Sequence, residues 1–292
     1  MANRWITTSA PCEVQPIDPQ GLAFNPALPQ PIFCTIGSAP RLDLISKKFG
    51  TTIAAETFAA TKYGIGLRTL RLAFSGIGYG TAAAAPRIKS DSWTILVLAN
   101  PAANSNLQTL LSQRMSGAPY QQLNLQANYG YAGAAPNGTL SIGLVDATTG
   151  SLGSQSASAV IDGNYRVLCT TRASAGTIPK LYVDGKPISI TSSAAAQSTI
   201  NAAQELHIGS PGDYPTDAGG YATNCDIVAV IIYPSVLSDA QIAYLGETPN
   251  AIWRAFELRR RRYSALASAF DAAAAARRRL MAFLYRHFFQ HS

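Results

Sequence analysis

The sequence predicts an all-β protein: an antiparallel β-sandwich of the jelly-roll type, with an extended segment before it and a helical segment after it. Two observations predict this class. Between about residues 41 and 235, short strand-like runs alternate with clusters of Gly, Asn, Ser and Pro, at roughly ten-residue spacing. The same region has no amphipathic segment long enough for a crossover helix, which disfavours a βαβ architecture.

The runs predicted to form strands are Gly66–Ser75, Ser92–Asn100, Leu107–Gln113, Gln121–Ala127, Thr139–Val145, Tyr165–Thr171, Lys180–Asp184, Glu205–Gly209 and Cys225–Tyr233. In the run 121–127, Leu123, Leu125 and Ala127 alternate with polar residues, so one face should pack on a core. The run 225–233 is apolar at nearly every position and should be buried on both faces. Gly76, Gly78 and Gly80 lie between two strands and indicate a turn rather than a phosphate-binding loop.

Composition excludes several classes of protein. The chain has 292 residues, 47% of them hydrophobic and 13% charged, whereas a mostly disordered chain is richer in charge and poorer in aromatic residues. No apolar run reaches the roughly 18 residues that a membrane span needs, and no hydrophobic run follows the first residues as in a secretory signal. We therefore expect a protein that is made in a cytosol and has no membrane partner.

The N-terminal segment is rich in proline. Residues 9–40 hold seven of the 17 prolines, and proline fixes φ and removes a backbone donor, so this stretch should be neither helix nor central strand. We place an extended arm at residues 1–40, which is either a disordered leader or an arm laid on a neighbouring subunit. The second alternative is favoured by its apolar side chains, Leu22, Phe24, Leu28, Ile32 and Phe33.

A short helix is predicted to start after Ser238. Ser238 is a good N-cap residue, and Gln241 at the third helical position completes a capping box. Ile242 and Leu245 give the helix an apolar face, and Gly246 supplies a C-terminal stop. The β-sandwich is therefore expected to span residues 41–248.

The C-terminal segment, residues 249–292, differs in charge from the rest of the chain. The whole net charge of +7 lies in residues 250–292, where nine arginines are balanced only by Glu257 and Asp271. A neutral body with a cationic end predicts an acidic partner, either a nucleic acid or the acidic surface of a protein. Because the arginine runs lack interleaved aromatic residues, non-specific nucleic-acid binding is disfavoured.

The same segment is predicted to form a long amphipathic helix, because residues 251–289 contain no Pro or Gly and apolar side chains recur at helical spacing. The helix either packs on its own domain or docks on another subunit. Docking is favoured, because arginine clusters surround most of the helix and because a lone helix is marginal in water. The residues expected to make the attachment are Trp253, Phe256, Arg259, Arg260, Arg261, Arg262, Phe270, Arg277, Arg278 and Arg279.

The four cysteines, Cys12, Cys34, Cys169 and Cys225, lie far apart and form no C-x-x-C pair. This spacing excludes metal-finger and redox motifs of that kind, and free thiols are favoured over disulfides. Cys169 and Cys225 lie in apolar strand-like runs and should behave as small buried hydrophobic residues.

Several short motifs resemble the laminin-G-like domains of the concanavalin A-like lectin/glucanase superfamily over about residues 41–247. The run 180–187 is similar to their strand–turn–strand signature, and its Asp184–Gly185 pair is also the sequence that a type I′ hairpin turn prefers. The other similar motifs are Ser92–Ile95, Glu205–Ser210, Asp226–Tyr233 and Leu237–Ile242. The resemblance implies the same jelly-roll sandwich.

A further likeness concerns the end of that region. The run Glu247–Phe256 resembles the N-P-W-q-l-F tail that follows such domains in virion proteins of tailed bacteriophages and prophages, although here Pro249 precedes Asn250. The likeness implies a structural component of a phage particle: a capsid decoration, head-fibre or tail-accessory protein, made in the host cytoplasm. Its partners would be other virion proteins and further copies of itself, trimers included. The alternative is a lectin-like protein that binds a glycan or receptor from the particle.

Catalysis is not expected. Of the three histidines, His287 and His291 lie near the C-terminus, and His207 lies in a predicted strand, where a structural role is favoured over a catalytic one. The H-E-x-x-H, G-x-S-x-G and P-loop motifs are missing, as is the E-x-D-x-x-E strand motif of the glucanase members. Because glycoside hydrolysis needs two carboxylates beside the scissile bond, we expect a protein that is not an enzyme and needs no cofactor.

Carbohydrate binding remains open, because sugars use aromatic faces and amides. Laminin-G-like domains often hold a calcium ion, and Asp213 and Asp217 could contribute to such a site. Two carboxylates in a loop of Gly and Pro more often solvate that loop, so no metal is expected. The loop residues expected to contact a glycan are Tyr120, Tyr129, Tyr131, Tyr214 and Tyr221.

Overall fold

A computed structural model describes residues 23–36, 42–46, 49–53, 57–69, 76–79, 88, 92–103, 107–114, 122–128, 137–146, 150–174, 176–193, 205–209 and 225–257. The strands are β1 (Ala23–Phe24), β2 (Phe33–Ile36), β3 (Thr51–Ile53), β4 (Thr57–Thr61), β5 (Gly64–Thr69), β6 (Gly76–Tyr79), β7 (Trp93–Ala99), β8 (Gln108–Arg114), β9 (Gln122–Ala127), β10 (Leu140–Asp146), β11 (Gly150–Ser156), β12 (Arg166–Arg172), β13 (Lys180–Val183), β14 (Lys186–Pro187), β15 (Ile190–Ser193), β16 (Leu206–Ile208), β17 (Cys225–Tyr233) and β18 (Phe256–Glu257). The helices are α1 (Asp239–Gly246) and the 3₁₀-helix η1 (Pro249–Ala255).

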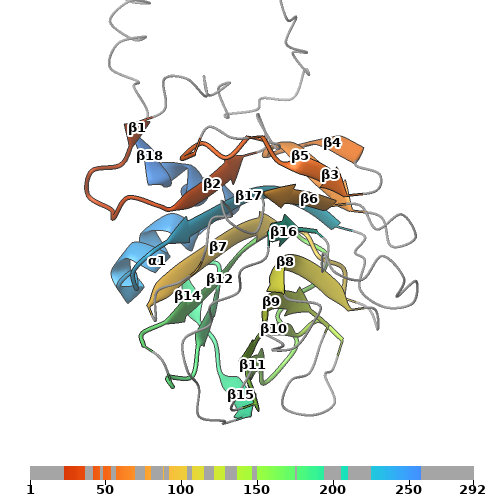
Figure 1. Ribbon diagram of the computed structural model, residues 1–292, viewed down its shortest axis with the longest axis vertical. Helices are drawn as coiled ribbons and strands as arrows, with labels where there is room; N and C mark the ends of the chain where they lie inside the picture. Colours follow the sequence, from red (N-terminus) through yellow and green to blue (C-terminus); the bar gives the residue numbers. More distant parts are fainter. Residues whose placement is uncertain are drawn as a thin grey trace, which may run out of the picture.

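Two antiparallel sheets face each other, which confirms the predicted sandwich (Figure 1). Sheet 1 has the strand order β15-β11-β10-β9-β8-β16-β6-β3. Sheet 2 has the order β14-β13-β12-β7-β17-β5-β4, and β2 also pairs with β17. A small ribbon of β1 and β18 lies apart from both sheets.

The main core lies between the two sheets. Leu123 and Leu125 of sheet 1 are 1% and 0% exposed and belong to the same apolar cluster as Trp93, Ile95 and Val97 of sheet 2. Successive side chains of a strand point to opposite faces. The alternation in β9 therefore fixes its inner face, as the sequence predicts.

A second apolar cluster covers the outer face of sheet 2. Leu96, Leu98 and Ile231 meet α1 and η1 there, and the cluster includes Ile242 of α1 and Ile252 of η1. The central strands of sheet 2 are therefore buried on both sides, and every residue of β17 is buried. This confirms the prediction for the run 225–233.

Helix α1 has the predicted capping box. The Gln241 backbone N–H donates to Ser238 Oγ at 3.2 Å, and the Ser238 N–H donates to Gln241 Oε1 at 2.9 Å. Its buried residues are Ile242, Leu245 and Gly246, because these carry the face that lies on sheet 2.

The Asp184–Gly185 turn forms as predicted and packs against α1. Both residues have positive φ, 49° and 73°. A Cβ on Gly185 would lie 2.8 Å from Ala243 Cα, so only glycine allows the turn this close to the helix. Beside it, the Tyr182 hydroxyl donates to Asp239 Oδ1 at 2.9 Å. Two of the motifs behind the family resemblance are therefore in contact.

The proline-rich segment differs from its prediction as an arm. Residues 33–36 form β2, which pairs with residues 229–232 of β17, and Phe33 and Cys34 are fully buried. This window contains no proline, so its backbone can complete a ladder although the prolines around it cannot. The sandwich therefore includes residues 23–36 and does not start at residue 41; residues 1–22 lie outside the described residues.

The start of the C-terminal segment also differs from its prediction. Trp253 and Phe256 are 8% and 3% exposed and belong to the apolar cluster on sheet 2. They were expected to contact a partner, but they stabilise their own domain instead, because the 3₁₀-helix η1 turns them onto the sheet. The remaining predicted attachment residues lie outside the described part of the chain: Arg259, Arg260, Arg261, Arg262, Phe270, Arg277, Arg278 and Arg279.

Two further details concern β6 and the cysteines. Gly76–Tyr79 is a strand between β16 and β3, not the predicted turn. Cys34, Cys169 and Cys225 are free and buried, as expected, whereas Cys12 is not among the described residues. In the row Cys34–Ile231–Leu96–Cys169, three strand spacings of about 4.8 Å separate the first and last residues by about 14 Å, well beyond disulfide reach.

Neither of the described helices has the length and apolar character of a membrane span.

Candidate functional site

The outer faces of the two sheets differ in chemistry. The outer face of sheet 2 is apolar and is covered by α1 and η1 of the same chain. The outer face of sheet 1 carries polar side chains, because the residues that alternate with its core-facing leucines are Ser, Thr, Asn, Gln and His. Most of these polar side chains are buried, Ser112, Ser141 and Gln126 among them.

Three of these residues form a polar row across neighbouring strands. His207 on β16 lies opposite Ser112 on β8, and Ser112 lies opposite Asn124 on β9. The row continues at both ends into glycines, with Gly78 next to His207 and Gly143 next to Asn124. Cross-strand neighbours have Cβ atoms about 5 Å apart, so the three side chains form one continuous line.

A second line of polar groups runs beside the polar row. The Gln126 side-chain amide donates to Thr109 Oγ1 at 3.2 Å. The Ser141 hydroxyl donates to the Gln126 carbonyl oxygen at 3.4 Å. These bonds hold the amide of β9 in place between β8 and β10.

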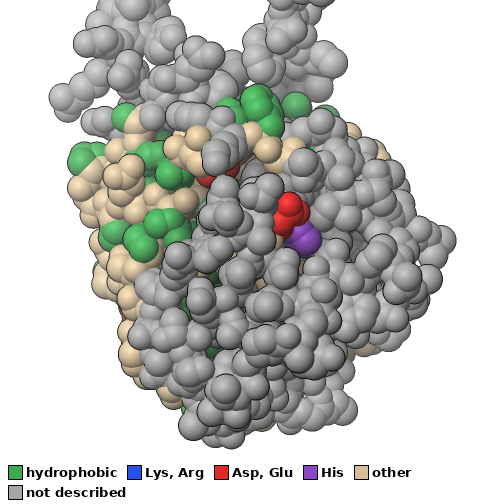
Figure 2. Space-filling model, in the orientation of Figure 1, with side chains coloured by type: hydrophobic (Ala, Val, Ile, Leu, Met, Phe, Trp, Pro, Cys, Tyr) green, Lys and Arg blue, Asp and Glu red, His purple; other side chains and the backbone are tan. Residues whose placement is uncertain are grey.

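Exposure decreases along the polar row from its Glu205 end. The Glu205 and His207 side chains are 34% and 11% exposed, and Glu205 Oε2 lies 3.2 Å from His207 Nε2. In Figure 2 an acidic and a histidine side chain lie next to each other at the surface, as this pair does. Ser112 and Asn124 are 0% and 3% exposed. The Glu205–His207 pair is therefore the accessible part of the row.

The charged groups elsewhere have structural partners. Asp226 accepts a bidentate pair of hydrogen bonds from Arg68 at 2.8 and 3.0 Å and a third from the Tyr165 hydroxyl. The hydrogen bond to Asp226 raises the pKa of Arg68, and burial, then Asp226, raises that of Tyr165. This network joins β5, β17 and the start of β12 and presents no open carboxylate.

A second network surrounds Arg166. Its guanidinium binds Asp184 at 2.6 Å and Asp162 at 2.7 Å. The hydrogen bond from Arg166 holds the pKa of Asp162 well below its usual range. The arrangement anchors the turn at Asp184 to β12, since Asp184 Oδ1 also accepts from the Val167 N–H.

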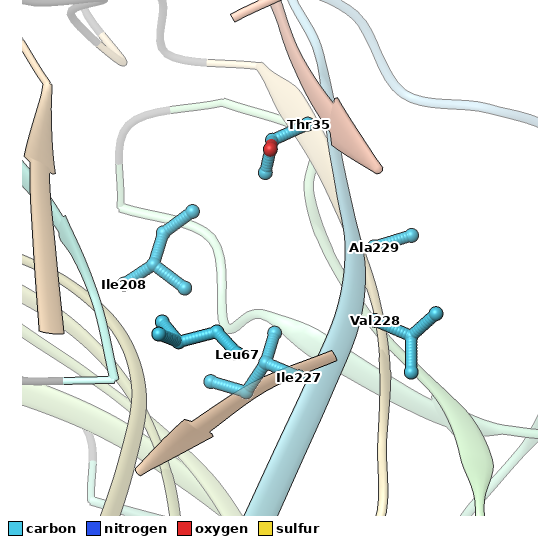
Figure 3. Close-up of a pocket in the computed structure, with 6 residues that line it drawn as sticks. All are labelled: Thr35, Leu67, Ile208, Ile227, Val228 and Ala229. Carbon is cyan, nitrogen blue, oxygen red and sulfur yellow. The ribbon is translucent and has the colours of Figure 1, made fainter. Parts of the chain in front are cut away.

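The described residues include no group of three or more His, Cys, Asp or Glu that could hold a metal ion. The small cavity between the sheets, drawn in Figure 3, has a volume of about 10 Å³ and is lined by Leu67, Ile208 and Ile227 among others. It has room for one water molecule at most. This cavity, formed by described residues, is therefore too small for a ligand of sugar size.

The tyrosines predicted to contact a glycan lie outside the described residues, as do Asp213 and Asp217. The strands that flank them are described. The segment 115–121 joins β8 to β9 at one end of sheet 1, whereas 129–136 and 210–224 start at the other end. Strands of six to seven residues separate these ends by about 20 Å, so the five tyrosines belong to connections at both ends of the sheet.

The sequence contained a signal for part of the site. The alternation in the run 121–127 already places Asn124 and Gln126 on the face away from the core. The contact between Ser112 and His207 had no such signal, because only the register of β16 on β8 makes them neighbours.

Comparison with known proteins agrees with this architecture. Residues 74–243, more than half of the chain, match the model of a family described as the concanavalin A-like lectin/glucanases superfamily. Comparison with curated proteins gives no match. Domain 4 of AbnA, an extracellular arabinanase from Geobacillus stearothermophilus, solved with arabinotriose, is 13% identical with a TM-score of 0.52, over 74% of this chain and 97% of that one.

A second similar structure is the Trypanosoma rangeli sialidase solved with sialic acid. It is 15% identical with a TM-score of 0.50, over 73% of this chain and 32% of the sialidase chain. At these identities the two likenesses concern the fold. Together with the family match over residues 74–243, they lead to one conclusion: the chain belongs to the concanavalin A-like lectin/glucanases superfamily.

Proposed function

We propose that the protein binds carbohydrate at the outer face of sheet 1, where the accessible Glu205–His207 pair makes the contact. The observation that carries the proposal is the difference between the two sheets. The central strands of sheet 2 use both of their faces for packing, whereas the outer face of sheet 1 carries polar side chains, of which the Glu205 carboxylate and the His207 imidazole reach the surface. Such groups are the usual partners of sugar hydroxyls.

The family supports the same substrate class. Its name combines lectins with glucanases, and a solved domain with this fold was determined with arabinotriose. We propose binding without turnover, since the accessible part of the row carries a single carboxylate, that of Glu205, whereas glycoside hydrolysis needs two.

The proposal is tested by screening the full chain on a glycan array and measuring the best ligand by calorimetry. Glu205→Gln keeps the shape of the side chain and removes its charge, and His207→Ala removes the imidazole beside it. Each should weaken binding about tenfold, the equivalent of one hydrogen bond to a charged or buried group. Asp162→Asn, whose side chain binds Arg166 and has no contact with the Glu205–His207 pair, is the control and should bind as the parent does.

Two outcomes would overturn the proposal. One is the absence of any glycan ligand for the folded full chain. The other is a ligand whose affinity is unchanged in both variants while their melting temperatures stay close to that of the parent. Release of reducing sugar from the bound glycan would instead show turnover and overturn the non-enzymatic part.

A second candidate function is attachment to a larger particle, such as a phage virion, through the terminal segments. The observation that favours it is the pairing of Ala23 with Glu257, because the segments 1–22 and 258–292 then both start from one place on the domain. The second of these segments has eight arginines and one aspartate. Deleting residues 258–292 should abolish incorporation into the particle and leave the melting temperature of the sandwich unchanged; retained incorporation would exclude this role.

A further inference from the structure

Strand β4 forms an open edge of sheet 2. Among the described strands it pairs with β5 alone, and Figure 1 shows it at the rim of the molecule. Its side chains are exposed or half-buried on both faces. Its five residues, Thr57–Thr61, contain no proline and no charge, which are the usual devices that stop such an edge from pairing with another strand.

The hairpin geometry shows which backbone groups face outward. Thr61 pairs with Gly64 across a two-residue turn, and such a closing pair exchanges both of its hydrogen bonds. Bonded and non-bonded pairs then alternate along an antiparallel ladder, so Ala59 and Thr57 also bond to β5. The N–H and C=O groups of Phe58 and Ala60 consequently point away from β5, toward the open edge.

We propose that β4 pairs with β4 of a second copy of this chain, antiparallel about a twofold axis at Ala59. In this register Phe58 of each copy lies opposite Ala60 of the other, so the outward backbone groups meet each other and form four hydrogen bonds. Thr57 lies opposite Thr61. Sheet 2 then continues through both copies, in a closed, isologous dimer.

The exposed side chains fit this register. Phe58 and Ile65 are 36% and 39% exposed, and they share a face with Leu67 of the core because Phe58 pairs with Leu67 and Ile65 with Ala60. In the dimer, Phe58 of one copy lies next to Ala60 of the other, with Ile65 just beyond it. The small alanine leaves room for Phe58 to cover Ile65, so both exposed apolar groups become buried.

Self-complementarity selects a second copy as the occupant of this edge. In this register the residue opposite Phe58 is the small Ala60 of the same segment, and each copy supplies both. The backbone groups that point to the open edge belong to these two residues as well, so one segment provides every group that the twofold pair needs.

Sedimentation velocity of the full chain over a dilution series tests the proposal. The parent should show a reversible monomer–dimer equilibrium. Ala60→Pro removes an N–H that points to the open edge, so the β4–β5 ladder stays intact, while two of the four intersubunit bonds are lost and dimerisation weakens about thirtyfold. Phe58→Lys should weaken it as well. Ile178→Lys, an equally exposed position on the other side of sheet 2, is the control and should not.

Two results would overturn this proposal. One is a parent that stays monomeric at every concentration, and the other is a dimer unaffected by both Ala60→Pro and Phe58→Lys. If Ala60→Pro lowers the melting temperature, Phe58→Lys still decides, since it leaves the backbone of β4 unchanged and its side chain is 36% exposed.

Discussion

Replacement of Gly185 by alanine should destabilise the protein more than the same replacement at Gly163 or Gly176, two glycines with a similar backbone conformation. Gly185 has a φ of +73°, and a Cβ there would lie 2.8 Å from Ala243 Cα and 3.1 Å from both Ala243 O and Glu247 N. All three atoms belong to the backbone of α1 and its C-cap, so no side chain can rotate to make room. Either the turn or the helix has to move.

Two contributions determine the size of the effect. The left-handed conformation costs a non-glycine residue about 1–2 kcal/mol, and forcing a methyl group into a packed contact costs about 1–3 kcal/mol. Gly163 and Gly176 have similar φ values, +81° and +75°, but a Cβ on either would meet no atom within 4 Å. Alanine at those two positions should therefore show the first cost alone, and at Gly185 the sum of both.

Urea unfolding followed by circular dichroism measures the three free energies of unfolding. We expect Gly185→Ala to lose about 2–5 kcal/mol and each control about 1–2 kcal/mol. A chain of this size should melt about 2–4 °C lower per kcal/mol lost. If Gly185→Ala were no less stable than Gly163→Ala and Gly176→Ala, the turn would not be held against α1 and the argument from the close approach would be wrong.

Three further predictions concern stability and reactivity. Tyr182→Phe removes the hydrogen bond to Asp239 and should lower the free energy of unfolding by about 1 kcal/mol. The same substitution should lower it by less when Asp239→Asn is already present, and a double-mutant cycle measures the difference. Burial first, and then that hydrogen bond, raise the pKa of Tyr182 to about 12. The contribution of the protonated Tyr182 to stability is therefore complete below pH 10 and is lost as the pH rises from about 10 to 12. In that window the parent should lose more stability than Tyr182→Phe does. The lowered pKa of Asp162 beside Arg166 gives a pH dependence of the opposite sign: the ionised Asp162 stabilises the folded protein above the ordinary carboxyl pKa, and this stabilisation is lost in acid. The free energy of unfolding of Asp162→Asn should therefore depend less on pH in the acid range. The three described cysteines are buried and should react with a thiol reagent only after denaturant is added; fast labelling of any of them in the folded protein would contradict the core assignment.

The sequence predicted those elements that have a local signal in their own residues, such as a continuous apolar run or a helix cap. The run 225–233 and the capping box at Ser238 were predicted with their observed bounds, because a continuous apolar run and a cap are local signals. Strand β11 was missed because two of its core-facing residues, Ser154 and Ser156, are polar. Ser156 is tolerated there because its hydroxyl accepts from the Leu140 N–H and donates to the Ser158 carbonyl.

Strand β2 was missed for a different reason. Seven prolines between residues 9 and 40 dominate the composition, and they conceal the four-residue strand 33–36, which lies in the proline-free window 32–39. The candidate site was the least predictable part. Its amides on β9 follow from alternation, but the contact of Ser112 with His207 depends on the pairing of strands that are distant in sequence, and no local pattern encodes that register.

The ribbon of β1 and β18 has a mechanical consequence. Ala23 pairs with Glu257 and Phe24 with Phe256, whose rings lie 5.3 Å apart, and the Asn25 side chain donates to the Arg254 carbonyl at 3.0 Å. A force that pulls residues 22 and 258 apart would peel this ribbon open one pair at a time, starting at its outer end. The two large sheets would carry none of that load until the ribbon had opened. Under tension the β1–β18 ribbon can therefore open while the sandwich stays folded.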